Sequence, residues 1–225
     1  IERWGQWEVA MQAPMRSVAN PFTDVALTVE LRAPGGALDT PVVVRGFYDG
    51  STTMTAVPGP HSSESTGVWR ARFMPPTTGT WSWHSRCSAV SSLDDKHGTF
   101  EVVLPSGTNH GPVRTHGTTF RYADGEPFHV VGTTVYGLSG GVWGSNKLTP
   151  NKTAETLGTL ARSPFNKVRM MAFPTADISA PTWLPYQIST SHPNQTDPTR
   201  FNLPFWQRLD QTIRALLELG IQADI

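Results

Sequence analysis

A glycine-rich segment in the middle of the chain carries a pattern that nucleophilic hydrolases use. Residues 137–141 read GLSGG, which matches the Gly-x-Ser-x-Gly elbow that exposes a serine nucleophile after a strand. Asp177 and His192 follow Ser139 in the order in which such hydrolases place the other triad members. An elbow needs a helix directly after the serine, whereas helical character here begins near Thr153. A serine hydrolase using Ser139 is therefore an alternative, not the leading hypothesis.

Cofactor and metal chemistry find little support in the residue spacing. The glycines in this region do not follow the Gly-x-Gly-x-x-Gly spacing of dinucleotide loops, since they fall at Gly137, Gly140, Gly141 and Gly144. The 7 histidines are dispersed, with no His-x-x-x-His pair on a helix. Cys87 stands alone, so it forms neither an internal disulfide nor a cysteine-based zinc site. We expect no metal and no cofactor.

One cation and several aromatic side chains are better candidates for a binding site. Arg169 interrupts an apolar run over residues 166–173, where a cation needs a partner, either in an ordinary buried ion pair or in a functional site. Tyr136 directly follows the apolar run 128–135 and either packs at a rim or contacts a ligand. Aromatic rings that could stack on sugars, or simply pack, lie at the end of the second run or in the segments after the two runs: Trp143, Phe173, Trp183 and Tyr186.

The first part of the chain has the rhythm of a β-domain. Short runs with alternating apolar residues are separated by Pro, Gly, Ser and Thr, and they cover residues 7–11, 25–31, 41–48, 67–73, 79–85 and 98–104. Such a pattern predicts antiparallel strands, and this many strands in about 100 residues predicts an immunoglobulin-like β-sandwich over residues 1–105. Trp69, Trp81 and Trp83 fit the core of that sandwich better than a sugar-binding surface.

The pattern changes after residue 105. Residues 105–112 are rich in turn residues and are interpreted as a linker, and residues 120–128 predict a hairpin turning at Asp124 and Gly125. A nearly continuous apolar run at 128–135 indicates a buried strand, residues 166–173 are interpreted as a second buried strand, and residues 153–161 predict a modest helix.

The clearest helix begins near residue 203. Asn202 is a suitable N-cap, and Pro204 lies in the first turn, where its missing N–H costs nothing. Apolar residues recur at helical spacing and form one stripe of Phe205, Leu209, Ile213 and Leu216. Gly220 ends the helix, and a third strand is predicted over residues 221–225.

Strand, helix, strand, helix, strand in succession favours a parallel sheet. The fold class expected is therefore multidomain β plus α/β, with residues 106–225 forming the first strands and helices of a truncated (β/α)8 TIM barrel. An incomplete barrel would expose strand edges, which leaves open self-association or association with a missing C-terminal part.

Short segments in order along the chain resemble a known bacterial family. They read ERWG at 2–5, NPFTDV at 20–25, GFYDG at 46–50, RFMP at 72–75, NHGPV at 109–113, ADGEP at 123–127, GTTVY at 132–136, SPFNKVRM at 163–170 and LGIQAD at 219–224. This set is similar to apiosidase-like glycoside hydrolases of the cellulase-type clan, which carry an N-terminal immunoglobulin-like domain of formerly unknown function.

The resemblance implies a glycosidase that acts on a polysaccharide or oligosaccharide by a retaining mechanism. In that mechanism two carboxylates lie about 5–5.5 Å apart, one as nucleophile and one as acid/base. In the family they lie on later strands, so the catalytic residues are expected downstream of Ile225. The resemblance also implies that Arg169 hydrogen-bonds the nucleophilic carboxylate. A non-catalytic carbohydrate-binding or adhesive protein is the second alternative.

Composition limits the partners further. Lys plus Arg and Asp plus Glu both number 18, and a formal net charge of zero argues against a nucleic-acid partner. No run approaches the roughly 18 apolar residues of a membrane span. The compartment stays open between the bacterial cytoplasm and secretion, with secretion favoured.

Overall fold

The computed structural model describes residues 1–15, 18–36, 39–52, 66–138, 141–143, 146–148, 150–172 and 183–225. The chain divides into two compact units, Ile1–Phe128 and His129–Ile225. Each unit has its own core of buried side chains.

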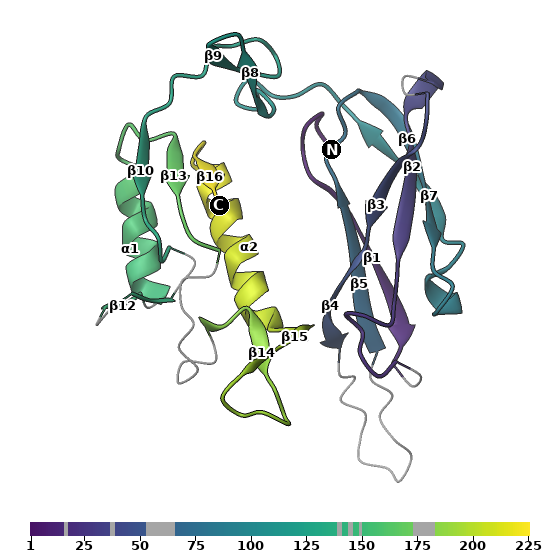
Figure 1. Cartoon of the computed structure of the whole chain (residues 1–225). Coiled ribbons are helices and arrows are strands. Elements are labelled where there is room, and N and C mark those ends of the chain that lie inside the picture. Colours follow the sequence, from purple (N-terminus) through teal and green to yellow (C-terminus); the bar gives the residue numbers. More distant parts are fainter. Residues whose placement is uncertain are drawn as a thin grey trace. The chain divides into compact units, whose positions relative to one another are not determined.

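Two antiparallel sheets build most of the first unit (Figure 1). One sheet has the order β1-β5-β4, with bounds Trp7–Pro14, Thr66–Phe73 and Phe47–Thr52. The other has the order β3-β2-β6-β7, with bounds Val42–Arg45, Thr28–Arg32, Gly79–Arg86 and His97–Val102. Short 3-10 helices cover Pro34–Gly36 and Ser91–Leu93. The β-rich unit is compatible with an immunoglobulin-like domain.

Alternate residues of these strands form the core. Val29 and Leu31 of β2 and Trp81 of β6 are fully buried, and Trp69 of β5 is only 1% exposed. Trp69 and Trp81 are therefore core residues, as the packing interpretation of these tryptophans predicts. Because the period of a strand is two, the residues between them point away from this core.

The segment after residue 105 folds back onto the N-terminus of the first unit. The side-chain amide of Asn109 donates hydrogen bonds to Glu2 Oε2 at 2.9 Å and to the Arg3 carbonyl at 3.0 Å. A hairpin of β8 (Val113–His116) and β9 (Thr119–Tyr122) follows. The stretch expected to be a linker is thus packed, and the compact unit runs on to Phe128. The domain boundary at residue 105 stays a prediction.

The second unit contains a three-stranded parallel sheet of order β10-β13-β16. Its strands are short and cover Gly132–Thr134, Lys167–Arg169 and Gln222–Asp224. The helices α1 (Pro150–Leu160) and α2 (Leu203–Glu218) connect them. Val168 of β13 is fully buried in one core cluster with Leu160 of α1 and Leu216 of α2, so both helices cover the same face of the sheet.

Helix α2 confirms the sequence prediction for residues 203–220. Phe205, Leu209 and Leu216 are buried along one stripe, and Gly220 adopts a φ of +71°, the left-handed conformation that ends helices. Asn202 precedes the helix, but its side chain donates to the Leu184 carbonyl at 2.7 Å and does not cap the helix. Among the described residues, no helix combines the length and apolar character needed to cross a membrane.

The described residues of the second unit also form two antiparallel ribbons. β11 (Gly141–Trp143) pairs with β12 (Asn146–Leu148), and β14 (Tyr186–Ile188) pairs with β15 (Thr196–Phe201).

The prediction that residues 106–225 open a (β/α)8 TIM barrel is wrong. The described chain is mostly small β-sheets with two α-helices, and its parallel strands span three residues each. The sequence predicts buried strands over 128–135 and 166–173, yet among the described residues of these segments only Gly132–Thr134 and Lys167–Arg169 pair with each other. An apolar run reports burial and not the length of a ladder, and barrel closure requires staggered partners around the whole ring.

Candidate functional site

A row of polar residues crosses the parallel sheet of the second unit. Thr134 pairs with Arg169, and Arg169 pairs with Asp224, so the three residues stand side by side on neighbouring strands. We call them the polar row. Val168 points into the core, so alternation places Arg169 on the opposite face, where it is exposed. The row lies at the carboxyl ends of the strands, where α/β sheets bind ligands.

The charges around this row are mixed. Lys167 Nζ lies 3.7 Å from Asp224 Oδ2, and both side chains are more than a third exposed. An exposed ion pair of this kind adds at most about 1 kcal/mol of stability. Together with Arg169, the face carries two cations and one carboxylate, an arrangement suited to holding an anionic group.

Tyr136 lies at the same end of the sheet. It follows β10 directly, and its carbonyl accepts a hydrogen bond from the Met171 amide at 3.1 Å. The Val135 amide in turn donates to the Arg169 carbonyl at 2.9 Å. The Tyr136 side chain is 40% exposed. The structure therefore brings two of the predicted site residues, Tyr136 and Arg169, to one edge.

The other predicted site residues are distributed differently. Trp183 is half-buried, and the Arg208 guanidinium lies over its ring, 4.2 Å from the centroid. Burial lowers the pKa of Arg208. One face of Trp183 is thus taken by a cation–π contact, so a sugar would have to stack on the other face. Trp143 lies in β11, paired with Asn146. Phe173 is outside the described residues, as are Ser139 and Asp177.

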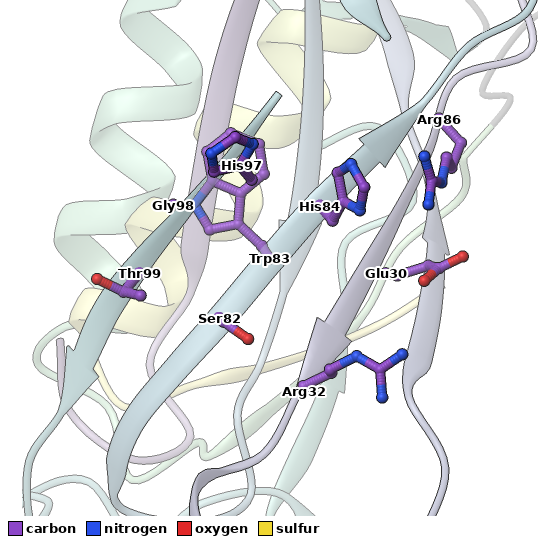
Figure 2. A pocket seen from close by; sticks show the side chains of 9 residues that line it. All are labelled: Glu30, Arg32, Ser82, Trp83, His84, Arg86, His97, Gly98 and Thr99. Carbon is purple, nitrogen blue, oxygen red and sulfur yellow. The ribbon is translucent and has the colours of Figure 1, made fainter. Parts of the chain in front are cut away.

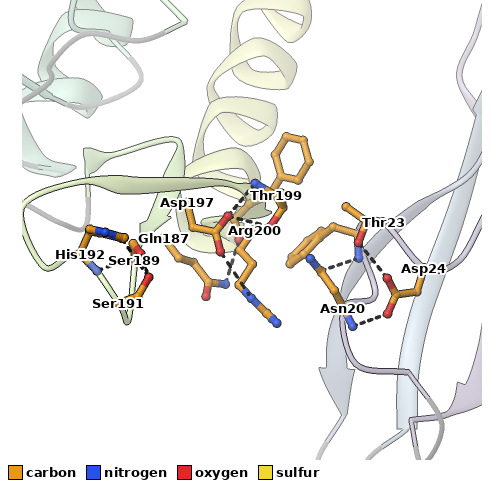
Figure 3. A network of polar contacts seen from close by, with 12 residues as sticks. Asn20, Thr23, Asp24, Gln187, Ser189, Ser191, His192, Asp197, Thr199 and Arg200 are labelled. Atoms are coloured by element: carbon orange, nitrogen blue, oxygen red, sulfur yellow. Dashed lines mark hydrogen bonds and ion pairs between the residues drawn. The ribbon is translucent and has the colours of Figure 1, made fainter.

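His192, the remaining member of the serine-hydrolase alternative, takes part in local contacts between β14 and β15. Its Nδ1 lies 3.0 Å from Ser191 Oγ, which lies 3.1 Å from Ser189 Oγ (Figure 3). In β15, Asp197 accepts hydrogen bonds from the hydroxyl and the backbone amide of Thr199, and these bonds lower the Asp197 pKa. These contacts shape a turn in which His192 is exposed.

A second concave site lies on the first unit, on the outer face of β2, β6 and β7. This hollow of about 380 Å³ is shown in Figure 2 and is lined by Glu30, Arg32, Ser82, Trp83, His84, Arg86, His97, Gly98 and Thr99. Glu30 pairs with His84, and His84 pairs with His97, so the three form a line across the strands. Sequence reasoning missed this group. No local signal marks it, because Glu30 and His97 lie outside runs 79–85 and 98–104 and the register that sets His97 opposite His84 is a long-range property.

Comparisons with known proteins place these features in context. Residues 1–88 match the model of a domain of unknown function, DUF5060. The chain is similar to a solved structure from Bacteroides vulgatus ATCC 8482, described as a "putative glycoside hydrolase", with 29% identity and a TM-score of 0.77. The match covers 99% of this chain and 40% of that one. No curated protein matches the chain. The chain is thus related in fold and sequence to a protein described as a glycoside hydrolase.

Proposed function

We propose that the protein containing this chain is a glycoside hydrolase acting on a polysaccharide or oligosaccharide. The observation that carries the proposal is the similarity over 99% of the chain, at a TM-score of 0.77, to the Bacteroides protein. Because the chain spans 40% of that protein's length, the catalytic carboxylates are proposed to lie beyond Ile225. A retaining mechanism and an apiosidase-like specificity are the finer parts of the proposal.

The polar row is the proposed contribution of this chain to the site. Arg169 is exposed at the carboxyl end of β13, and we propose that it meets a catalytic carboxylate from beyond Ile225. A guanidinium binds a carboxylate through a planar pair of N–H groups, which aligns it and keeps it ionised. Tyr136 at the same edge and the second face of Trp183 are proposed to contact the sugar.

The test uses the full-length protein. A panel of aryl glycosides, apiosides included, and of plant, algal and microbial polysaccharides is incubated with it, and released reducing ends are measured. We expect hydrolysis of at least one class of these substrates. NMR of the initial product, before it mutarotates, should show that the anomeric configuration is retained. An inverted product would overturn the retaining mechanism alone. Binding without hydrolysis would favour the non-catalytic carbohydrate-binding alternative. The absence of both binding and hydrolysis would overturn the proposal.

A further inference from the structure

Three potential metal ligands meet at one end of the hollow on the first unit. His84 of β6 and His97 of β7 are directly opposite each other in the ladder (Figure 2). Asp95 lies in the connection that leads into β7. The donor atoms of these three side chains all lie within 4.8 Å of one another. Cross-strand pairing thus brings together residues whose sequence spacing gave no metal-binding pattern.

The backbone holds Asp95 in a defined position. Its φ is +53°, a left-handed conformation that few residues other than glycine adopt and that aspartate tolerates better than most. The Asp95 amide donates to the Ser85 carbonyl at 3.1 Å. In this arrangement the Asp95 carboxylate lies 2.6 Å from His84 Nε2.

Ser85 fixes the connection from beneath. It is fully buried, its hydroxyl donates to the Leu93 carbonyl at 2.7 Å, and the same hydroxyl accepts from the Lys96 amide at 2.9 Å. These bonds fix the backbone that carries Asp95, so the ligand-bearing connection needs little reorganisation when a metal binds.

We propose that His84, Asp95 and His97 bind a divalent transition-metal ion of the zinc class. Two imidazole nitrogens and one carboxylate oxygen suit Zn²⁺, Cu²⁺ or Ni²⁺ better than Mg²⁺ or Ca²⁺, which prefer sites made of oxygen alone. Ligand atoms about 2.0–2.2 Å from zinc stand about 3.3–3.6 Å apart in a tetrahedron, so donors within 4.8 Å of one another reach an ion by small side-chain movements. Three protein ligands leave a position for water.

The surrounding charges set the expected strength of binding. Glu30 is the ladder partner of His84, and it lines the hollow together with Arg32 and Arg86. The hollow therefore carries one carboxylate and two guanidinium groups besides the Asp95 carboxylate at its end. We expect weaker binding than at a closed structural zinc site, because the Asp95 side chain is 75% exposed.

Titration calorimetry of the 225-residue chain with Zn²⁺ tests this site independently of any glycosidase activity. The wild-type chain is expected to bind one equivalent at the cluster. His84→Gln and His97→Gln should each weaken that binding at least about tenfold, whereas His116→Gln, an exposed histidine of β8, should leave it unchanged.

NMR of the histidine rings adds a readout that does not depend on variant stability. The ring signals of His84 and His97 should shift together on addition of one equivalent of Zn²⁺, with the His116 signals unmoved. The proposal would be overturned if the wild-type chain did not bind Zn²⁺, or if the His84 and His97 variants bound it as tightly as the wild type.

Discussion

Trp4 and Gly111 show how single residues anchor the segment after residue 105. Gly111 has a φ of +73°, and a Cβ there would lie 2.5 Å from Cδ2 of Trp4. We expect Gly111→Ala to destabilise the first unit by at least about 2 kcal/mol, through backbone strain and a clash with the indole. Urea unfolding followed by tryptophan fluorescence measures the effect.

Gly107 provides the matched control for this prediction. A Cβ added there meets no atom within 4 Å. Gly107→Ala should therefore leave the unfolding midpoint nearly unchanged or raise it slightly. Equal midpoints for the two alanine variants would show that the Trp4 contact does not constrain this position.

Asp124 is predicted to link stability to pH. The Glu126 amide donates to its carboxylate, and His110 lies 2.6 Å away; these contacts lower the Asp124 pKa below its ordinary value of 3.8. A depressed pKa means that the ionised carboxylate stabilises the folded state at pH values above the ordinary pKa. This contribution is lost as the pH falls through the folded-state pKa. Asp124→Asn should therefore lose less stability than wild type between pH 5 and pH 2.

Thermal melting across this pH range measures that difference. The same substitution at the exposed Asp39 serves as the control. If Asp124→Asn and wild type lose stability in parallel on acidification, the His110 and Glu126 contacts do not stabilise the ionised carboxylate.

Arg169 carries the residue-scale prediction for the proposed glycosidase. Arg169→Ala in the full-length protein should lower kcat/KM about 100-fold, because a catalytic carboxylate would lose a fixed charged donor. Arg162→Ala, at an exposed arginine just after α1, should leave kcat/KM unchanged. If the two variants had similar kcat/KM values, the polar row would not be part of the active site.

At the level of elements, α2 depends on its apolar stripe. Leu216 is fully buried, whereas the next residue, Leu217, is 72% exposed. Leu216→Ala should destabilise the second unit by about 2–5 kcal/mol through the cavity that it leaves. Leu217→Ala should change stability by no more than about 0.5 kcal/mol. Hydrogen exchange of the amides in α2 and β16 measures both effects, and similar protection in the two variants would contradict the packing described here.

The same elements show where sequence reasoning succeeded and where it did not. The period of 3.6 and the terminal glycine of α2 are local signals, so the helix was predictable. The β14–β15 ribbon has no counterpart among the predicted strands, because Pro198 and polar neighbours hide the strand pattern. Proline is tolerated in such an edge pairing, which no local rule reveals in advance.

For the whole molecule, two separate cores predict separate responses to mutation. Gly111 and Leu216 belong to different compact units. The stability losses of Gly111→Ala and Leu216→Ala should therefore add in the double variant within about 0.5 kcal/mol. Hydrogen exchange resolved by segment measures each unit in turn; a coupling well above that value would mean that the two cores unfold as one.

The sequence by itself determined the features that rest on short-range patterns. Alternating apolar residues placed Trp69 and Trp81 in a β-core, and helical spacing placed Phe205 and Leu216 on the buried face of α2. These patterns follow from the backbone periods of strand and helix, which act within a few residues.

Only the tertiary structure decided how distant segments meet. It joined Thr134, Arg169 and Asp224 in one row, set His84 against His97, and arranged the strand–helix units as an open three-stranded sheet, not a barrel. The physical reason is that strand pairing and register depend on long-range contacts between residues far apart in the chain, which no local period encodes.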